Sequence, residues 1–162
     1  MFQARAIGDV EKPELYRELA QQLEALLAGE SDAIANSANA AAFLYHTLPD
    51  VNWVGFYFLR GDELVLGPFQ GQPACVRIPV GKGVCGTAVA ERRTVRVADV
   101  LAFPGHIACD TASRSEVVVP LTRDHMIVGV LDVDSPRASR FDADDEKGLE
   151  RLAAIYAAAT EF

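Results

Sequence analysis

Helical and strand-like segments follow one another along this chain in an order that allows few folds. Helical spacing is clearest near the N-terminus, in the apolar series Leu15, Leu19, Leu23, Leu26 and Leu27. A second helix, with Ile34 on its apolar face, is expected after the cap residue Ser31, and a last helix after Asp142. Segments rich in β-branched and aromatic residues predict two hairpins between these helices, at 52–66 and 116–133.

Three shorter elements are expected between the hairpins: strands at 76–80 and 94–97, and a helix at 83–92. Helices at both ends with hairpins between them predict one α+β domain over residues 1–162, built as an antiparallel sheet with helices on one face. The opposite face would carry the loops that hold the cysteines. Half of the residues are hydrophobic, which is enough for a substantial core without disulfide support.

Charge and hydropathy exclude several classes of protein. The net charge is −8 and no tract of lysine and arginine is present, so we expect neither a nucleic-acid partner nor an anionic membrane surface. The N-terminus lacks the apolar region of a signal peptide, and no apolar run approaches the ~20 residues of a membrane helix. We therefore expect a soluble, cytoplasmic protein. The sequence leaves the oligomeric state open, with a homodimer as one option.

Three cysteines, Cys75, Cys85 and Cys109, lie among loop and helix-start residues. A thiol near a cation or a helix N-terminus has a lowered pKa and becomes a nucleophile. His106 is either a hydrogen-bonded loop residue or a group that raises the thiolate fraction of Cys109. The spacings Cys-x9-Cys and Cys-x23-Cys lack the tight ligand pair of structural zinc sites, so no metal is expected. An odd set of three also argues against a disulfide framework, and thiol chemistry is the remaining interpretation.

Aromatic residues alternate along the first predicted strand. Because residues two apart share a face, Trp53, Gly55 and Tyr57 project together, with a bare glycine between two large rings. This predicts a shallow aromatic slot suited to a thioether-like group. The alternative is that these rings simply fill the core.

Two carboxylates, Asp132 and Asp134, share a face at the end of an otherwise apolar strand. Side by side they repel, so they need a cation or a shared proton, and a substrate ammonium or a general-acid role would supply one. The alternative is a solvated strand end that opens into the turn at Ser135 and Pro136.

The position of Glu116 depends on the register of the second hairpin. If Leu121 pairs with Ile127, Glu116 joins the two aspartates, whereas a pairing of Leu121 with Met126 turns it to the opposite face. The sequence does not decide between these registers.

Long runs of the sequence carry a resemblance to a known family. They are NWVGFY at 52–57, LGPFQG at 66–71, PAC at 73–75, GVCG at 83–86, FPGHIACD at 103–110, SRSE at 113–116 and LDVDSP at 131–136. These runs resemble the GAF-domain family of free methionine-(R)-sulfoxide reductases. The resemblance implies a GAF fold, with a central antiparallel sheet of about six strands flanked by helices. It also implies reduction of free L-methionine (R)-S-oxide, with thioredoxin as the reductant and no metal or organic cofactor.

The resemblance also implies roles for individual residues. Cys109 takes the place of the attacking thiol, Cys75 that of the resolving thiol, and Cys85 that of a third cysteine whose role is open. The pocket positions of the family fall on Trp53, Tyr57, Glu116, Asp132 and Asp134.

The chemistry of these residue types agrees with such a reaction. A Cys109 thiolate can attack the sulfoxide sulfur while protonated Glu116 or Asp134 donates to the oxygen. The resulting sulfenic acid would condense with Cys75 to a disulfide. Asp132 would bind the substrate ammonium, and the aromatic residues would enclose the methyl group. Two other functions stay open: a non-catalytic GAF module for a small ligand, and a thiol-based oxidant sensor.

Overall fold

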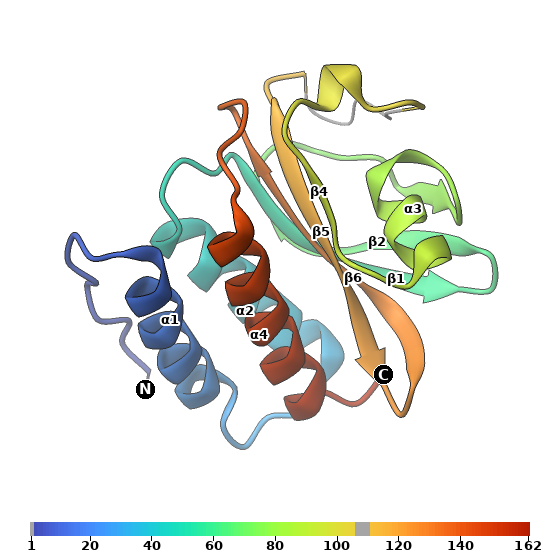
Figure 1. Ribbon diagram of the computed structural model, residues 1–162. Helices are drawn as coiled ribbons and strands as arrows, with labels where there is room; N and C mark the ends of the chain where they lie inside the picture. Colours follow the sequence, from blue (N-terminus) through green and yellow to red (C-terminus); the bar gives the residue numbers. More distant parts are fainter. Residues whose placement is uncertain (1, 106–110) are drawn as a thin grey trace.

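The computed structural model describes residues 2–105 and 111–162, with helices on both sides of a central sheet (Figure 1). The elements along the described chain are α1 (Lys12–Leu27), α2 (Ala33–Thr47), β1 (Trp53–Arg60), β2 (Glu63–Gln70), β3 (Arg77–Pro79), α3 (Gly83–Glu91), β4 (Val95–Val97), the short 3-10 helix η1 (Val100–Ala102), β5 (Ser115–Arg123), β6 (Met126–Ser135) and α4 (Ala143–Ala159).

The six strands form one antiparallel sheet in the order β3-β2-β1-β6-β5-β4. This confirms the predicted α+β class and both hairpins, although β2 and β6 extend further than expected. The predicted start of the second helix is wrong by one residue. Asp32, not Ser31, caps α2, because its side chain accepts a hydrogen bond from the Ala35 amide. Ile34 is also misassigned, since it lies 59% exposed on the surface of α2.

Each face of the sheet has its own apolar core. Helices α1, α2 and α4 cover one face, and their side chains pack with those of β1, β5 and β6 that point toward them. Helix α3 and its neighbouring connections cover the other face and enclose a second, smaller core (Figure 1). The expectation of helices on one face alone is therefore wrong, because α3 shares the face that carries the cysteine loops.

The layer of helices is held together by one buried carboxylate at the start of α4. Asp145 is fully buried and accepts hydrogen bonds from the Tyr16 hydroxyl and from Arg140 Nη1, both at 2.9 Å. Lys12 Nζ lies 2.5 Å from its second oxygen. Gly148, one turn further, leaves room for the Tyr16 ring, which a methyl group there would overlap. This network joins α1 to α4.

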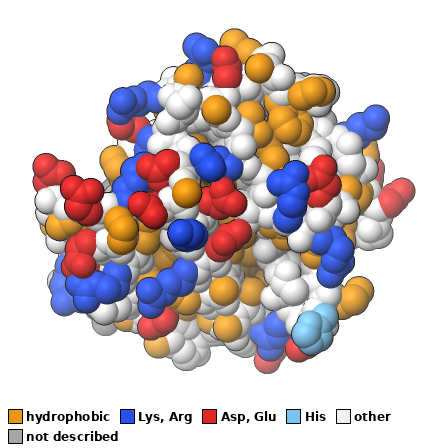
Figure 2. All heavy atoms as spheres, in the orientation of Figure 1, with side chains coloured by type: hydrophobic (Ala, Val, Ile, Leu, Met, Phe, Trp, Pro, Cys, Tyr) orange, Lys and Arg blue, Asp and Glu red, His pale blue; other side chains and the backbone are white. Residues whose placement is uncertain are grey.

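In the described ranges, no helix is long and apolar enough to cross a membrane. Figure 2 shows acidic and basic side chains interspersed over one face of the molecule.

Replacing Asp145 should destabilise the fold strongly. Asp145→Ala leaves the buried Arg140 guanidinium without its counter-ion, so we expect a loss of roughly 3 to 5 kcal/mol in the free energy of unfolding. Asp144→Ala, at an exposed position of the same turn, is the matched control and should cost less than about 1 kcal/mol. Urea denaturation measures both, and equal losses would contradict this role of Asp145.

Candidate active site

Three acidic residues meet on the face of the sheet that α3 covers. In the central strand pairs, Gly55 lies opposite Asp132, and Asp134 lies between Trp53 on one side and Glu116 on the other. Since side chains of paired residues share a face, the carboxyl groups of Glu116, Asp132 and Asp134 project together. The predicted cluster of two aspartates is confirmed, and Glu116 belongs to it.

The register that brings Glu116 into the cluster depends on a β-bulge. Near the hairpin turn Thr122 pairs with Ile127, but the next pair is Leu121 with Gly129, so Val128 is an extra residue on β6. Neither pairing of Leu121 considered from the sequence is present.

The bulge decides which face Glu116 occupies. If the register near the turn continued without it, Glu116 would lie opposite Val133, whose side chain belongs to the core under the helices. With the extra residue, Glu116 lies opposite Asp134 and faces the second core instead. One inserted residue therefore assembles the acidic cluster.

Cys85 completes this cluster from the first turn of α3. Its Sγ atom lies 3.3 Å from Asp132 Oδ2 and 4.0 Å from Glu116 Oε1. Cys85, Glu116 and Asp132 are 4% to 6% exposed, and Asp132 Oδ1 has no hydrogen-bond partner among the described residues. Their ligand atoms lie within 4.8 Å of one another, so a single cation, either an ammonium group or a metal ion, could contact all three.

Within residues 2–105 and 111–162, no lysine, arginine or histidine forms an ion pair with Glu116 or Asp132. Burial, together with the charge of Asp132 and Asp134, raises the pKa of Glu116 well above its usual range. Burial also raises the pKa of Asp132 to about 7, against the lowering effect of hydrogen bonds with Cys85 and Glu116. The cluster therefore retains protons near neutral pH.

The same surroundings act on the thiol. Burial first, and then the charges of Asp132 and Glu116, raise the pKa of Cys85 well above its usual value. The general expectation that a thiol at a helix N-terminus becomes a nucleophile is therefore wrong for Cys85. It is a protonated thiol that donates a hydrogen bond to Asp132.

The aromatic slot predicted over Gly55 is filled by the protein itself. The Trp53 ring folds back across Gly55, where a methyl group would come within 2.4 Å of it. The ring stacks on Phe69 at 5.2 Å between centroids and lies 6.0 Å from the Tyr57 ring. Trp53 and Tyr57 are only 2% and 1% exposed, so both rings are part of the second core, and Trp53 itself occupies the space above Gly55.

The polar ends of both rings contact the segment between β2 and β3. Trp53 Nε1 donates to the Gln72 carbonyl and the Tyr57 hydroxyl donates to the Cys75 carbonyl, each at 3.0 Å. Sequence reasoning missed Phe69 and Gln72 as neighbours of the site, although both belong to or adjoin the LGPFQG run. Cys75 is disulfide-bonded, whereas Cys85 is a free thiol.

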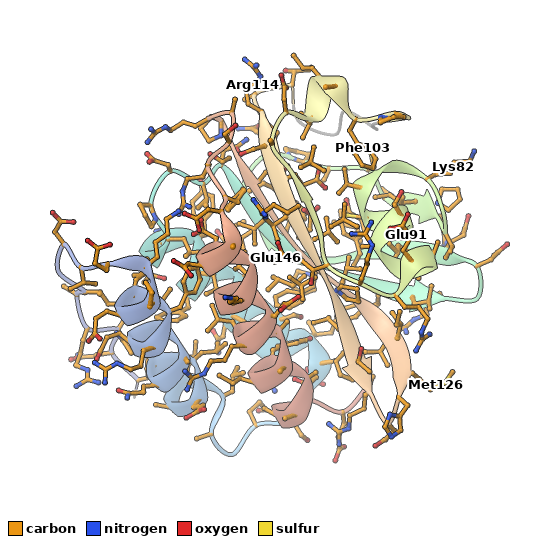
Figure 3. The ribbon with its side chains drawn as sticks, in the orientation of Figure 1. Lys82, Glu91, Phe103, Arg114, Met126 and Glu146 are labelled. Carbon is orange, nitrogen blue, oxygen red and sulfur yellow. The ribbon has the colours of Figure 1, made fainter. Side chains whose placement is uncertain are left out.

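The remaining predicted positions lie around the connection after η1. Phe103 packs against the second core, and Figure 3 shows it on the same side of the sheet as Lys82, which precedes α3. His106 and Cys109, both singled out from the sequence, lie outside the described residues.

This architecture and the sequence match known proteins. The family model described as "GAF domain" matches residues 30–161, so the chain belongs to the GAF-domain family. The free methionine-R-sulfoxide reductase of Escherichia coli (strain K12) is 56% identical over 143 residues, which cover 88% of this chain and 87% of that protein. Protein YtsP of Bacillus subtilis (strain 168) is 61% identical over 148 residues, which cover 90% of each.

Solved structures agree with these relatives. The X-ray structure of free methionine-R-sulfoxide reductase from Neisseria meningitidis, in complex with its substrate, superimposes with a TM-score of 0.94 at 48% identity. The match covers 98% of this chain and 95% of that one. Within the GAF-domain proteins, the chain thus belongs to the family of free methionine-R-sulfoxide reductases.

The raised pKa of Asp132 predicts how stability depends on pH without ligand. In the folded protein the pKa of Asp132 is about 7, above its ordinary value of 3.8. Between about pH 4 and 7 the unfolded chain therefore binds fewer protons than the folded protein, and the free energy of unfolding falls as the pH rises through this range. The slope for one such group reaches about 1.4 kcal/mol per pH unit. Asp132→Asn should flatten it in urea denaturations between pH 5 and 7.

Asp124→Asn is the control for this comparison, because the Asp124 side chain is 92% exposed. Its slope should match that of the parent protein. A parent slope that Asp132→Asn leaves unchanged would show that Asp132 retains no excess proton.

Proposed function

We propose that this protein reduces free L-methionine (R)-S-oxide to L-methionine. The observation that carries the proposal is the buried group of Glu116, Asp132 and Cys85, which has no counter-ion within the described ranges. A free amino acid brings an ammonium group that fits this site, whereas a methionine within a peptide chain does not. The relatives from Escherichia coli and Neisseria meningitidis support the same substrate.

Substrate binding follows from the charges and surfaces at the site. Asp132 accepts the ammonium group, with Asp134 beside it on the same strand face. The rings of Trp53 and Tyr57 supply an apolar wall for the methyl group on sulfur. Ionised Asp132 paired with the ammonium group replaces protonated Asp132, so binding near neutral pH releases a proton from the cluster.

The first chemical step uses one thiol and one acid. The Cys109 thiolate attacks the sulfoxide sulfur to form a sulfur–sulfur bond, and the sulfoxide oxygen accepts a proton from the acid. The hydroxyl then moves to the Cys109 sulfur as the sulfur–sulfur bond and the original S–O bond break, which leaves a sulfenic acid on Cys109 and releases methionine. Glu116 is the proposed proton donor, because burial keeps its pKa high enough to retain a proton near neutral pH. Asp134, directly opposite on β6, is the alternative donor.

Cys75 carries out the second step. Its sulfur attacks the sulfenic sulfur of Cys109, a disulfide forms, and the oxygen leaves as water. Thioredoxin, in a reducing cytoplasm, then returns both thiols by exchange and is itself oxidised. The disulfide-bonded state of Cys75 and the free thiol of Cys85 support this division of roles.

Cys85 has a different role in this proposal. Its buried, protonated thiol donates to Asp132 Oδ2 and so keeps that carboxylate oriented. It neither attacks the substrate nor enters the disulfide.

Cysteine substitutions test the proposed cycle. With thioredoxin, thioredoxin reductase and NADPH, the protein should consume only the R epimer of free methionine sulfoxide. In a single turnover without reductant, Cys109→Ser should release no methionine, whereas Cys75→Ser should release about one equivalent and leave a trappable sulfenic acid. Chromatographic measurement of methionine and mass spectrometry of the dimedone adduct give both results.

The reverse pattern would show that the two cysteines have exchanged roles. NADPH oxidation no faster than in a blank without protein would remove the reductase function altogether.

A further inference from the structure

The segment from Gly71 to Val76 carries Cys75 along the surface between β2 and β3. Val76 is 64% exposed, whereas Ala74 and Cys75 are partly buried against the second core. Hydrogen bonds also hold the segment. The Val76 carbonyl accepts from the Leu66 amide at 2.9 Å, and the two carbonyls bound by the aromatic side chains lie upstream of it, at Gln72 and at Cys75 itself.

The two aromatic donors are themselves held rigidly. Trp53 lies between the Phe69 and Tyr57 rings, with centroids at 5.2 and 6.0 Å. Two glycines make room for its indole: a methyl group at Gly55 would come within 2.4 Å of the ring, and one at Gly71 within 2.6 Å. An indole enclosed on these sides cannot change rotamer without repacking its neighbours.

We infer that Tyr57 and Trp53 are positioning residues for Cys75, which hold its segment in the geometry that disulfide closure requires. A disulfide forms only within narrow limits of distance and orientation, so the rate and extent of closure depend on how often the segment occupies the right place. The Tyr57 hydroxyl binds the carbonyl of Cys75 and thereby restrains the backbone from which the sulfur projects.

This inference rests on the proposed function for its place in the catalytic cycle. There the Cys75 sulfur displaces oxygen from the sulfenic sulfur of Cys109, and water leaves. Trp53 and Tyr57 would then act at both stages, with their rings forming the apolar wall of the substrate pocket and their polar atoms holding the resolving segment.

Tyr57→Phe separates these two roles, because it removes only the hydroxyl. The test is the equilibrium between the dithiol and disulfide forms of the protein in glutathione buffers, read by mass spectrometry after acid quench and alkylation. The effective concentration of Cys75 toward its partner thiol should fall roughly three- to tenfold in the variant, as expected for loss of one partly buried hydrogen bond. Trp53→Phe, which loses the Nε1–H donor, should also lower the effective concentration of Cys75.

Tyr156→Phe is the matched control. The Tyr156 hydroxyl also donates to a backbone carbonyl, that of Ala33 at 3.4 Å, but on the opposite face of the sheet. In Tyr156→Phe, the effective concentration of Cys75 toward its partner thiol should stay within about twofold of the parent value. An unchanged value in Tyr57→Phe, or an equal loss in Tyr156→Phe, would overturn the inference. Should Tyr57→Phe fail to fold, Trp53→Phe decides it by the same criterion.

The equilibrium also distinguishes this inference from the proposed function, since it requires no methionine sulfoxide. A protein that shows no reductase turnover but a weakened disulfide in Tyr57→Phe would refute the function and retain the positioning role.

Discussion

A group of buried acids to which the described residues offer no counter-ion is the constraint on which the rest of this structure depends. Glu116 and Asp132 are each 6% exposed, and the Cys85 thiol, which lies within 4.0 Å of both, itself carries a proton. Burial of ionised carboxyl groups in such surroundings is costly, so the empty site retains protons. A cation that enters can replace those protons, and this exchange is the basis of the proposed binding of a substrate ammonium group.

The fold supplies this site through the sheet rather than through mobile loops. Three carboxyl groups come from two central strands, and helix α3 closes over them with Cys85 in its first turn. On the opposite face, Asp145 joins helices α1 and α4. The second core lies on the face that carries the acidic cluster. On the same face, the aromatic residues of β1 donate hydrogen bonds to carbonyl groups of the segment that carries Cys75.

Strand alternation predicts much of this site from the sequence. It places Asp132 with Asp134, and Trp53 with Tyr57, because a period of two is a property of every strand. The position of Glu116 needed the β-bulge at Val128, which no local pattern in the sequence marks. The filling of the slot above Gly55 by Trp53 and the high pKa of Cys85 depend on long-range packing, which spacing along the chain does not encode. The roles of His106 and Cys109, which lie outside the described residues, remain predictions from the sequence.

Proton release on substrate binding tests the central claim most directly. Isothermal titration calorimetry of Cys109→Ser with L-methionine (R)-S-oxide, at pH 7 in two buffers of different ionisation enthalpy, gives the number of protons exchanged. We expect the release of up to about one proton per substrate, because the ammonium group takes the place of a proton on the cluster. The N-acetyl derivative, which lacks the ammonium group, should bind more weakly and release no proton. Binding of both compounds with equal affinity and without proton release would contradict this expectation.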